Sequence, residues 1–172
     1  MSDIINGKAF VCGDGITVYQ IIPEAHWTMN KMDAQAMGNW VFETLEEGCL
    51  EKEGAFKSKG YSIVVAGETF GNGSKSVEHP MAALKGAGIK LIIAESVSRY
   101  SYRNAINLAL PVLICPGISK KVSKNDILSA DPATGVITNE TKKEIYQAQP
   151  LGDFAMGIIR AGGLINYISE DR

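Results

Sequence analysis

The sequence contains few residues of the types that build disulfide frameworks or metal centres. It has only three cysteines, Cys12, Cys49 and Cys115, among its 172 residues. They are odd in number, far apart and without a Cys-x-x-Cys pair, which argues against a disulfide framework. An iron–sulfur cluster usually takes clustered thiolates, so these cysteines are also poor candidates for its ligands. We therefore predict thiols in the core or in loops, and no metal bound by this chain.

Long apolar runs and an excess of one charge are also missing. No stretch approaches the roughly 20 apolar residues of a membrane span. The segment 1–10 has neither the apolar run nor the basic lead of a signal peptide. The formal net charge is −2, from 17 basic and 19 acidic residues, so neither nucleic acid nor an acidic membrane surface is an expected partner. These absences favour a cytoplasmic location.

The amino-acid composition is that of an ordinary globular protein. Hydrophobic residues make up 45% of the chain, and 172 residues suffice for one domain with a real core. We find no internal repeat, low-complexity tract or linker. The sequence therefore predicts a single domain over residues 1–172.

The most informative stretch is a glycine-rich loop at residues 67–80, which contains Gly71, Gly73 and His79. An apolar run at 61–66 precedes it and is typical of a buried strand, and residues 81–88 follow it as a short helix ended by glycine. Glycines let a backbone approach a ligand closely, and a helix N-terminus presents free N–H groups that suit an anion. The alternative is a plain glycine-rich turn, because the spacing of neither a phosphate-binding P-loop nor a dinucleotide fingerprint is present.

A second apolar run at 89–94 makes this loop part of a strand, helix, strand unit. Such a unit is normally right-handed with parallel strands, and ligands gather where the carboxyl ends of the strands meet helix N-termini. We therefore expect the glycine-rich loop and residues 96–99 to lie at the same edge of the sheet. Arg99 and Arg103 are four residues apart and share a helix face. Two interpretations stay open for them: binding of carboxylates or of a partner, and simple exposure to solvent.

The remaining elements follow from apolar periodicity and turn residues. We expect a helix over 32–50, capped by Asp33 and stopped near Gly48, and an exposed loop over 51–60. A strand that runs into a turn at Pro23 is one interpretation of the segment before it. The other expected elements are strands at 4–12 and 110–115, paired strands around a turn at 135–139 and 141–148, and a closing helix and strand at 154–159 and 161–167.

The loop also carries a family resemblance. It resembles the small subunit of the isopropylmalate dehydratase group, the swivel domain of the aconitase superfamily, which has Phe-Gly-x-Gly-Ser-Ser-Arg-Glu-His-Ala-Pro after a strand. The matching residues are Phe70, Gly71, Gly73, Ser74, Glu78, His79 and Pro80. The Ser-Ser-Arg core instead reads as residues 74–77, Ser-Lys-Ser-Val, one residue longer and without the arginine. Further matches run from about Ile4 to Tyr167, among them Asn104, Asn107, Leu110, Pro111 and the Gly-Gly-Leu at 162–164.

The resemblance implies an α/β fold, a swivelling β/β/α domain with a compact, flattened barrel-like β core flanked by helices. It implies a heteromeric hydro-lyase of leucine biosynthesis that dehydrates and rehydrates a hydroxylated di- or tricarboxylate. The [4Fe–4S] cluster of such an enzyme lies on a separate large subunit, with which this chain would pair; self-association is a further possibility.

The resemblance also assigns roles to residues of this chain. A hydroxyl of the loop is the expected catalytic base, Ser74 in the first place and Ser76 as the alternative. Expected substrate-binding residues are Gly73, Lys75, Arg99, His26, Trp27 and Thr28. Lys75 supplies a charge where the family has arginine, but it cannot form the planar fork of a guanidinium. Glu78 and His79 are expected to support the loop or an interface, and for His79 a hydrogen-bonded histidine of the core is an equal alternative. For Trp27 and His26 the alternative is an anchor to the core and a solvated side chain.

Three functions remain open on these grounds. The first is the small subunit of a 3-isopropylmalate dehydratase. The second is the same scaffold used for another 2-alkylmalate, such as 2,3-dimethylmalate or citramalate, and the missing arginine gives this weight. The third is a non-catalytic anion-binding or assembly module. A strong loss of turnover on Ser74→Ala with assembly intact distinguishes an enzyme from a bare scaffold.

Overall fold

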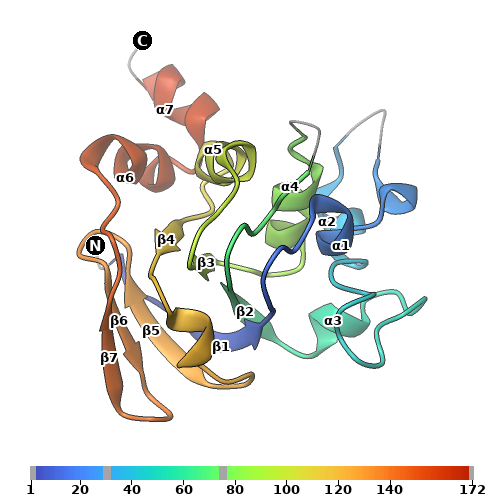
Figure 1. Ribbon diagram of the computed structural model, residues 1–172. Coiled ribbons are helices and arrows are strands. Elements are labelled where there is room, and N and C mark those ends of the chain that lie inside the picture. Colours follow the sequence, from blue (N-terminus) through green and yellow to red (C-terminus); the bar gives the residue numbers. More distant parts are fainter. Residues whose placement is uncertain (1–2, 29–31, 74–76, 171–172) are drawn as a thin grey trace.

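A computed structural model describes residues 3–28, 32–73 and 77–170 of the chain. Its centre is one seven-stranded sheet with the order β4-β3-β2-β1-β5-β6-β7 (Figure 1). The strands are β1 (Ile5–Val11), β2 (Tyr61–Ala66), β3 (Leu91–Ala94), β4 (Val112–Ile114), β5 (Ile127–Asp131), β6 (Val136–Asn139) and β7 (Glu144–Gln147). The helices are α1 (Val18–Ile21), α2 (Ala34–Gly38), α3 (Ala55–Ser58), α4 (His79–Gly86), α5 (Arg99–Asn107), α6 (Asp153–Arg160) and α7 (Leu164–Glu170), with single 3₁₀ turns η1 (Glu24–His26) and η2 (Ile118–Lys120).

The strands divide into a parallel and an antiparallel half that share β1. Strands β1 to β4 pair in parallel, with Ile63 opposite Leu91 in the β2–β3 pair. Strands β5, β6 and β7 continue the sheet antiparallel from the other side of β1. The predicted strand, helix, strand unit is therefore confirmed as β2–α4–β3, and so are the paired strands β6 and β7.

The sheet curls until its two ends approach each other. Beyond β7, Gln149 forms an antiparallel bridge with Ile114 of β4, and its backbone N–H donates to the Ile114 carbonyl oxygen at 2.9 Å. The curled sheet with helices outside it confirms the predicted fold class of a barrel-like β core flanked by helices (Figure 1).

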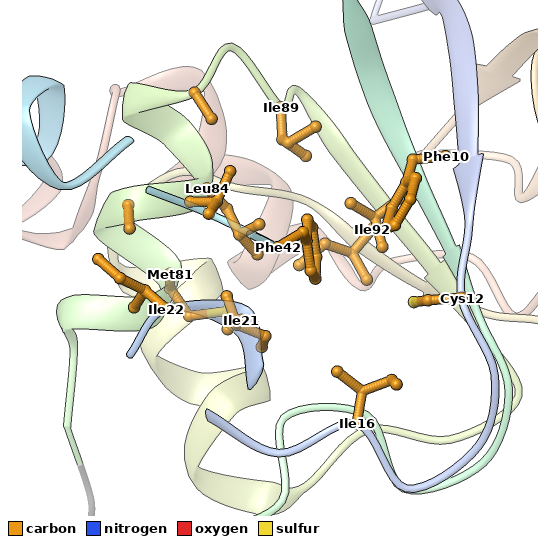
Figure 2. Packing of buried hydrophobic residues seen from close by; sticks show 14 of the residues in the cluster. Phe10, Cys12, Ile16, Ile21, Ile22, Phe42, Met81, Leu84, Ile89 and Ile92 are labelled. Carbon is orange, nitrogen blue, oxygen red and sulfur yellow. The ribbon is translucent and has the colours of Figure 1, made fainter. Parts of the chain in front are cut away.

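Two apolar cores lie on the two faces of the central strands. Alternate residues of β2 point to opposite sides, so that Val64 packs in one core and Ile63 in the other. This explains why the strand is apolar throughout rather than alternating. The first core is covered by α1, α2, α3 and α4; Figure 2 shows Phe42, Ile92 and Leu84 pointing into the same apolar space. The second core lies under α6 and the β5–β6 strands.

The prediction of one long helix over 32–50 is wrong. Asp33 caps α2 as expected, since its Oδ1 accepts the Ala36 N–H at 3.0 Å, but α2 ends at Gly38. Phe42 has a positive φ of 53°, which no right-handed helix tolerates. Its backbone N–H donates to the Ile21 carbonyl oxygen at 2.8 Å instead of to its own segment. The apolar residues whose spacing suggested a helix therefore lie on a series of turns, from which Phe42 packs into the core.

Three shorter segments also differ from expectation. Residues 51–60 contain α3, whose Phe56 is buried, rather than only an exposed loop. The segment before Pro23 forms α1, because Thr17 and Gln20 make a reciprocal capping box. The last expected strand is helix α7, in which Ile165 is exposed and Tyr167 packs against α6. None of the helices in the described part of the chain is long and apolar enough to cross a membrane.

Candidate active site

Three turns meet at the carboxyl ends of the parallel strands. The glycine-rich loop after β2 forms isolated bridges on both sides, between Asn72 and Thr17 and between Phe70 and Val97. The Glu68 N–H donates to Asp14 Oδ1 at 2.8 Å, and the Thr69 N–H donates to Ser96 Oγ at 2.8 Å. The expectation that this loop and the turn after β3 lie at the same edge is therefore confirmed.

The start of the loop has a backbone that only glycine allows. Gly71 has a φ of +72°, and a Cβ placed there would lie 2.4 Å from Ser101 Oγ. A Cβ on Gly73, the other matched glycine, would lie 2.7 Å from Val18 Cγ2, so the loop also passes α1 closely. The matched glycines are thus explained by close approach of the chain to its neighbours, before any ligand is considered.

The end of the loop leads into α4. Glu78 precedes the helix without a side-chain cap, and Pro80 occupies its first turn. The first N–H groups of a helix have no partner within it, so this terminus suits a carboxylate. Gly73 is exposed at the other side of the loop. The predicted base Ser74, its alternative Ser76 and the predicted cation Lys75 lie outside the described residues.

Trp27 is buried within a stack of aromatic rings. Its ring lies parallel to that of Tyr19 at 5.9 Å between centroids and to that of His79 at 5.1 Å. Its indole N–H donates to the Ile22 carbonyl oxygen at 3.2 Å, and only 8% of the residue is exposed. The structure therefore places Trp27 as an anchor to the core, which is one of the two alternatives that the sequence left open.

His26 contacts two other residues rather than facing solvent freely. Its ring stacks on Trp40 at 4.1 Å with an interplanar angle of 1°, and its Nε2 lies 3.3 Å from Glu43 Oε1. The Thr28 hydroxyl oxygen accepts the Asp33 N–H at 2.8 Å, which links the segment 24–28 to the cap of α2. Both histidines of the chain thus stack on its two tryptophans.

The contact of Trp27 with His79 joins two predicted site segments that are far apart in the sequence. His79 is the first residue of α4, so the segment 24–28 lies against the start of this helix. Further along the same helix, α2 packs closely on α4, since a Cβ on Gly86 would meet the Ala34 carbonyl oxygen at 1.6 Å. His79 thus lies between α4 and the segment 24–28, and its role in supporting the loop stays a prediction.

Arg99 and Arg103 both lie exposed on α5. Neither forms an ion pair with an acidic group within residues 3–28, 32–73 and 77–170. On the other face of α5, Ser101 and Asn104 are buried and donate hydrogen bonds to the glycine-rich loop. Ser98 and Ser101 were not predicted as functional residues. The only signal in the sequence is the spacing of three residues from Ser98 to Ser101 and from Ser101 to Asn104, which indicates a shared helix face.

The cysteines do not form a metal site among the described residues. All three are buried free thiols, and burial raises the pKa of the Cys12 thiol to about 12. Burial also raises the pKa of Cys49 and of Cys115. Nowhere in the described ranges do three His, Cys, Asp or Glu side chains gather as metal ligands.

Comparison with known proteins agrees with this architecture. The family model of the aconitase C-terminal domain matches residues 26–115. The 3-isopropylmalate dehydratase small subunit of Pyrobaculum calidifontis is 41% identical, over 97% of this chain and 98% of its own length. The isopropylmalate/citramalate isomerase small subunit of Methanocaldococcus jannaschii is 38% identical over 99% of this chain and 96% of its own.

A solved structure extends the likeness to three dimensions. The crystal structure of 3-isopropylmalate dehydratase from Methanocaldococcus jannaschii has a TM-score of 0.83 and 30% identity, covering 98% of this chain and 95% of that one. The similarity of sequence and of fold thus extends over nearly the whole chain. The chain belongs to the family of 3-isopropylmalate dehydratase small subunits.

Proposed function

We propose that this chain is the small subunit of a hydro-lyase that removes and re-adds water on a 2-alkylmalate-type hydroxy acid, with 3-isopropylmalate as the first candidate. The observation that carries the proposal is the full-length similarity to relatives with this name. The word "small subunit" in those names supports a large-subunit partner, to which we assign the [4Fe–4S] cluster. We place the complex in the cytoplasm and the whole chain in one domain.

The reaction requires the removal of a proton next to a carboxylate. This needs a base held in a desolvated site and cations or N–H groups that bind the carboxylates. We assign the base to Ser74, with Ser76 as the alternative. Lys75, the backbone of Gly73 and the start of α4 bind a carboxylate in this assignment, and a nearby positive charge lowers the pKa of a serine hydroxyl.

Arg99 offers a further cation near the same edge. It begins α5, one residue after Ser98, which contacts the Gly71 carbonyl. Its side chain is exposed, so a substrate carboxylate or a group on the large subunit can reach it. Glu78 and His79 support the loop in this proposal, with His79 acting through its stack on Trp27.

The segment 24–28 is the proposed determinant of the substrate's alkyl group. The segment includes His26, Trp27 and Thr28. Trp27 is buried and anchors the segment to the core. A second substrate has specific support, since one relative is named an isopropylmalate/citramalate isomerase small subunit. Citramalate and 2,3-dimethylmalate are therefore the next candidates, and the loop without its arginine is the feature that would accompany such a change.

The test is anaerobic reconstitution with the cognate large subunit, followed by assays on 3-isopropylmalate, citramalate and 2,3-dimethylmalate. We expect turnover of at least one acid and a fall of kcat by about 100-fold or more in Ser74→Ala. Ser58→Ala is the matched control, because the exposed Ser58 hydroxyl donates only to the Ala55 carbonyl oxygen on α3. A complex that forms and holds its cluster but turns over none of the acids would leave the chain as an anion-binding or assembly module.

A further inference from the structure

Three polar side chains at intervals of three residues lie on one face of α5 and at its N-cap. They are Ser98, Ser101 and Asn104, and residues three apart lie on the same side of a helix. The Ser98 and Ser101 hydroxyls both donate to the Gly71 carbonyl oxygen, at 2.6 and 2.7 Å. The Asn104 amide donates to the Val77 carbonyl oxygen at 2.9 Å. Side chains on one helix face therefore bind two backbone carbonyl groups of the glycine-rich loop, those of Gly71 and Val77.

These bonds are directed away from the helix that carries the donors. A serine within a helix commonly bonds back to a carbonyl of its own preceding turn. Ser101 instead reaches a segment 30 residues away, and it is only 3% exposed. Asn104 is 8% exposed and reaches across 27 residues. Since burial of a polar side chain is unfavourable unless it is hydrogen-bonded, the sites of these side chains depend on the loop carbonyls.

The contacts fix the orientation of the Gly71–Asn72 peptide. Two donors use both lone pairs of the Gly71 carbonyl oxygen. On the opposite side, the N–H groups of Gly71 and Asn72 both donate to the Ile16 carbonyl oxygen, at 2.8 and 3.1 Å. A rotated peptide would lose bonds on both sides at once, so this arrangement is strongly favoured over its alternatives.

We propose that Ser98, Ser101 and Asn104 are positioning residues that fix the glycine-rich loop at two points, Gly71 and Val77, for the dehydration reaction. The inference rests on the proposed function, in which this loop supplies the base. None of the three touches the reacting atoms; each acts through the loop backbone. Because a misplacement of about 1 Å costs on the order of 100-fold in rate, loss of this support lowers kcat more than it raises KM.

The test compares two kinds of variant with matched controls in the complex with the large subunit. Ser98→Ala/Ser101→Ala removes both donors to Gly71, and Asn104→Asp removes the donor to Val77 with little change in shape. Ser169→Ala and Asn166→Asp are the controls, since these exposed side chains on α7 donate to the Ile165 and Ala161 carbonyl oxygens at 2.8 and 3.0 Å. Ser98→Thr/Ser101→Ala keeps one hydroxyl on the carbonyl and tests rescue.

Two readouts separate positioning from a merely structural role. We expect kcat to fall about 10- to 100-fold with KM changed less than about threefold, and amide exchange in residues 68–82 to accelerate about tenfold, the factor for one lost hydrogen bond of about 1.4 kcal/mol. Neither control should change either quantity, and the threonine variant should recover most of kcat. If the double variant does not fold, Asn104→Asp alone tests the positioning role. If Asn104→Asp does not fold, the double variant alone tests it.

Three outcomes would overturn the inference. The first is faster exchange with an unchanged kcat, which would mean that the contacts hold the loop without serving the reaction. The second is a lower kcat with unchanged exchange, which would indicate direct contact with the substrate. The third is an equal effect in the α7 controls. A wild-type complex without any turnover would defeat the proposed function, and the fixation of the loop at Gly71 and Val77 would then be decided by the exchange rates alone.

Discussion

The substitution Gly86→Ala tests how closely α2 and α4 pack. Gly86 is the last residue of α4, and alanine is favoured over glycine inside a helix by about 1 kcal/mol. From the sequence alone, this substitution should therefore stabilise the protein. In the structure, however, the new Cβ would lie 1.6 Å from the Ala34 carbonyl oxygen and 2.4 Å from the Ala34 carbonyl carbon. Ordinary contact needs about 3.5 Å, so α2 would have to move by about 2 Å.

This movement has a predictable effect on stability. Insertion of a methyl group into a packed contact costs typically about 1–3 kcal/mol, and the upper end applies here because the obstacle is backbone rather than a flexible side chain. After the gain in helix propensity, we expect the free energy of unfolding to fall by about 2 kcal/mol. Urea denaturation of the isolated chain measures this difference, provided that unfolding is two-state.

The matched control for this test is Gly152→Ala. A Cβ at Gly152 would have no atom within 4 Å, and its φ of −69° suits any residue. Because Gly152 is also the N-cap of α6, where alanine is less favourable than glycine, this loss offsets the entropic gain from a less flexible unfolded chain. This variant should therefore be as stable as the wild type to within about 1 kcal/mol. If Gly86→Ala proves as stable as Gly152→Ala, the close crossing of α2 and α4 is refuted.

Three further predictions concern the described residues outside the loop. Glu46 is held by Lys59 and Lys124, each at 2.8 Å, so Glu46→Gln should lower stability at pH 7 by about 2 kcal/mol. Burial by itself raises the pKa of Glu46, but the two ammonium groups hold it below its ordinary value. The difference in free energy of unfolding between the wild type and Glu46→Gln should therefore be complete above about pH 4.3 and shrink as the pH falls below it. A difference that stays constant in urea denaturation down to pH 3 would contradict this. The three buried thiols should react with a thiol reagent only after unfolding, whereas fast labelling of the native protein would show that they are accessible. Thr17→Ala removes the capping box of α1 and should cost about 1 kcal/mol, a loss of roughly 2–4 °C in the melting temperature; an unchanged melting temperature would mean that the cap contributes nothing.

The parts of the fold that the sequence predicted are those whose pattern is local. The apolar run of β2, the glycine-rich loop and α4 follow one another, so their order alone predicts a parallel unit. The family resemblance supplied the curled sheet, which no local pattern indicates, because its closure depends on Gln149 meeting Ile114 late in the chain. The long helix over 32–50 failed for the same reason, since Phe42 bonds to Ile21 rather than to its own segment.

The candidate site divides in a similar way. The loop, its glycines and His79 were predictable from the motif. The stack of Trp27 on His79 and the three hydrogen-bond donors on α5 and at its N-cap were not predictable, because each contact joins segments that lie 27 or more residues apart. A serine or an asparagine on a helix carries no sign of its partner in the sequence. Only their common face, at intervals of three residues, distinguishes them from solvated side chains.

The two helices beside the loop hold the site by different interactions, and this difference has a consequence for substrate choice. The segment 24–28 lies on α4 through the stack of Trp27 on His79, whereas the loop is tied to α5 and its N-cap at Gly71 and Val77 by directed hydrogen bonds. Packing tolerates a change of shape better than a directed bond does, provided that volume is kept. Exposed positions of the segment, such as Ala25, can therefore change to suit another alkyl group without moving the loop that is tied to α5. In our proposal, selectivity thus resides in the packed segment, while the geometry of proton removal resides in the bonded loop.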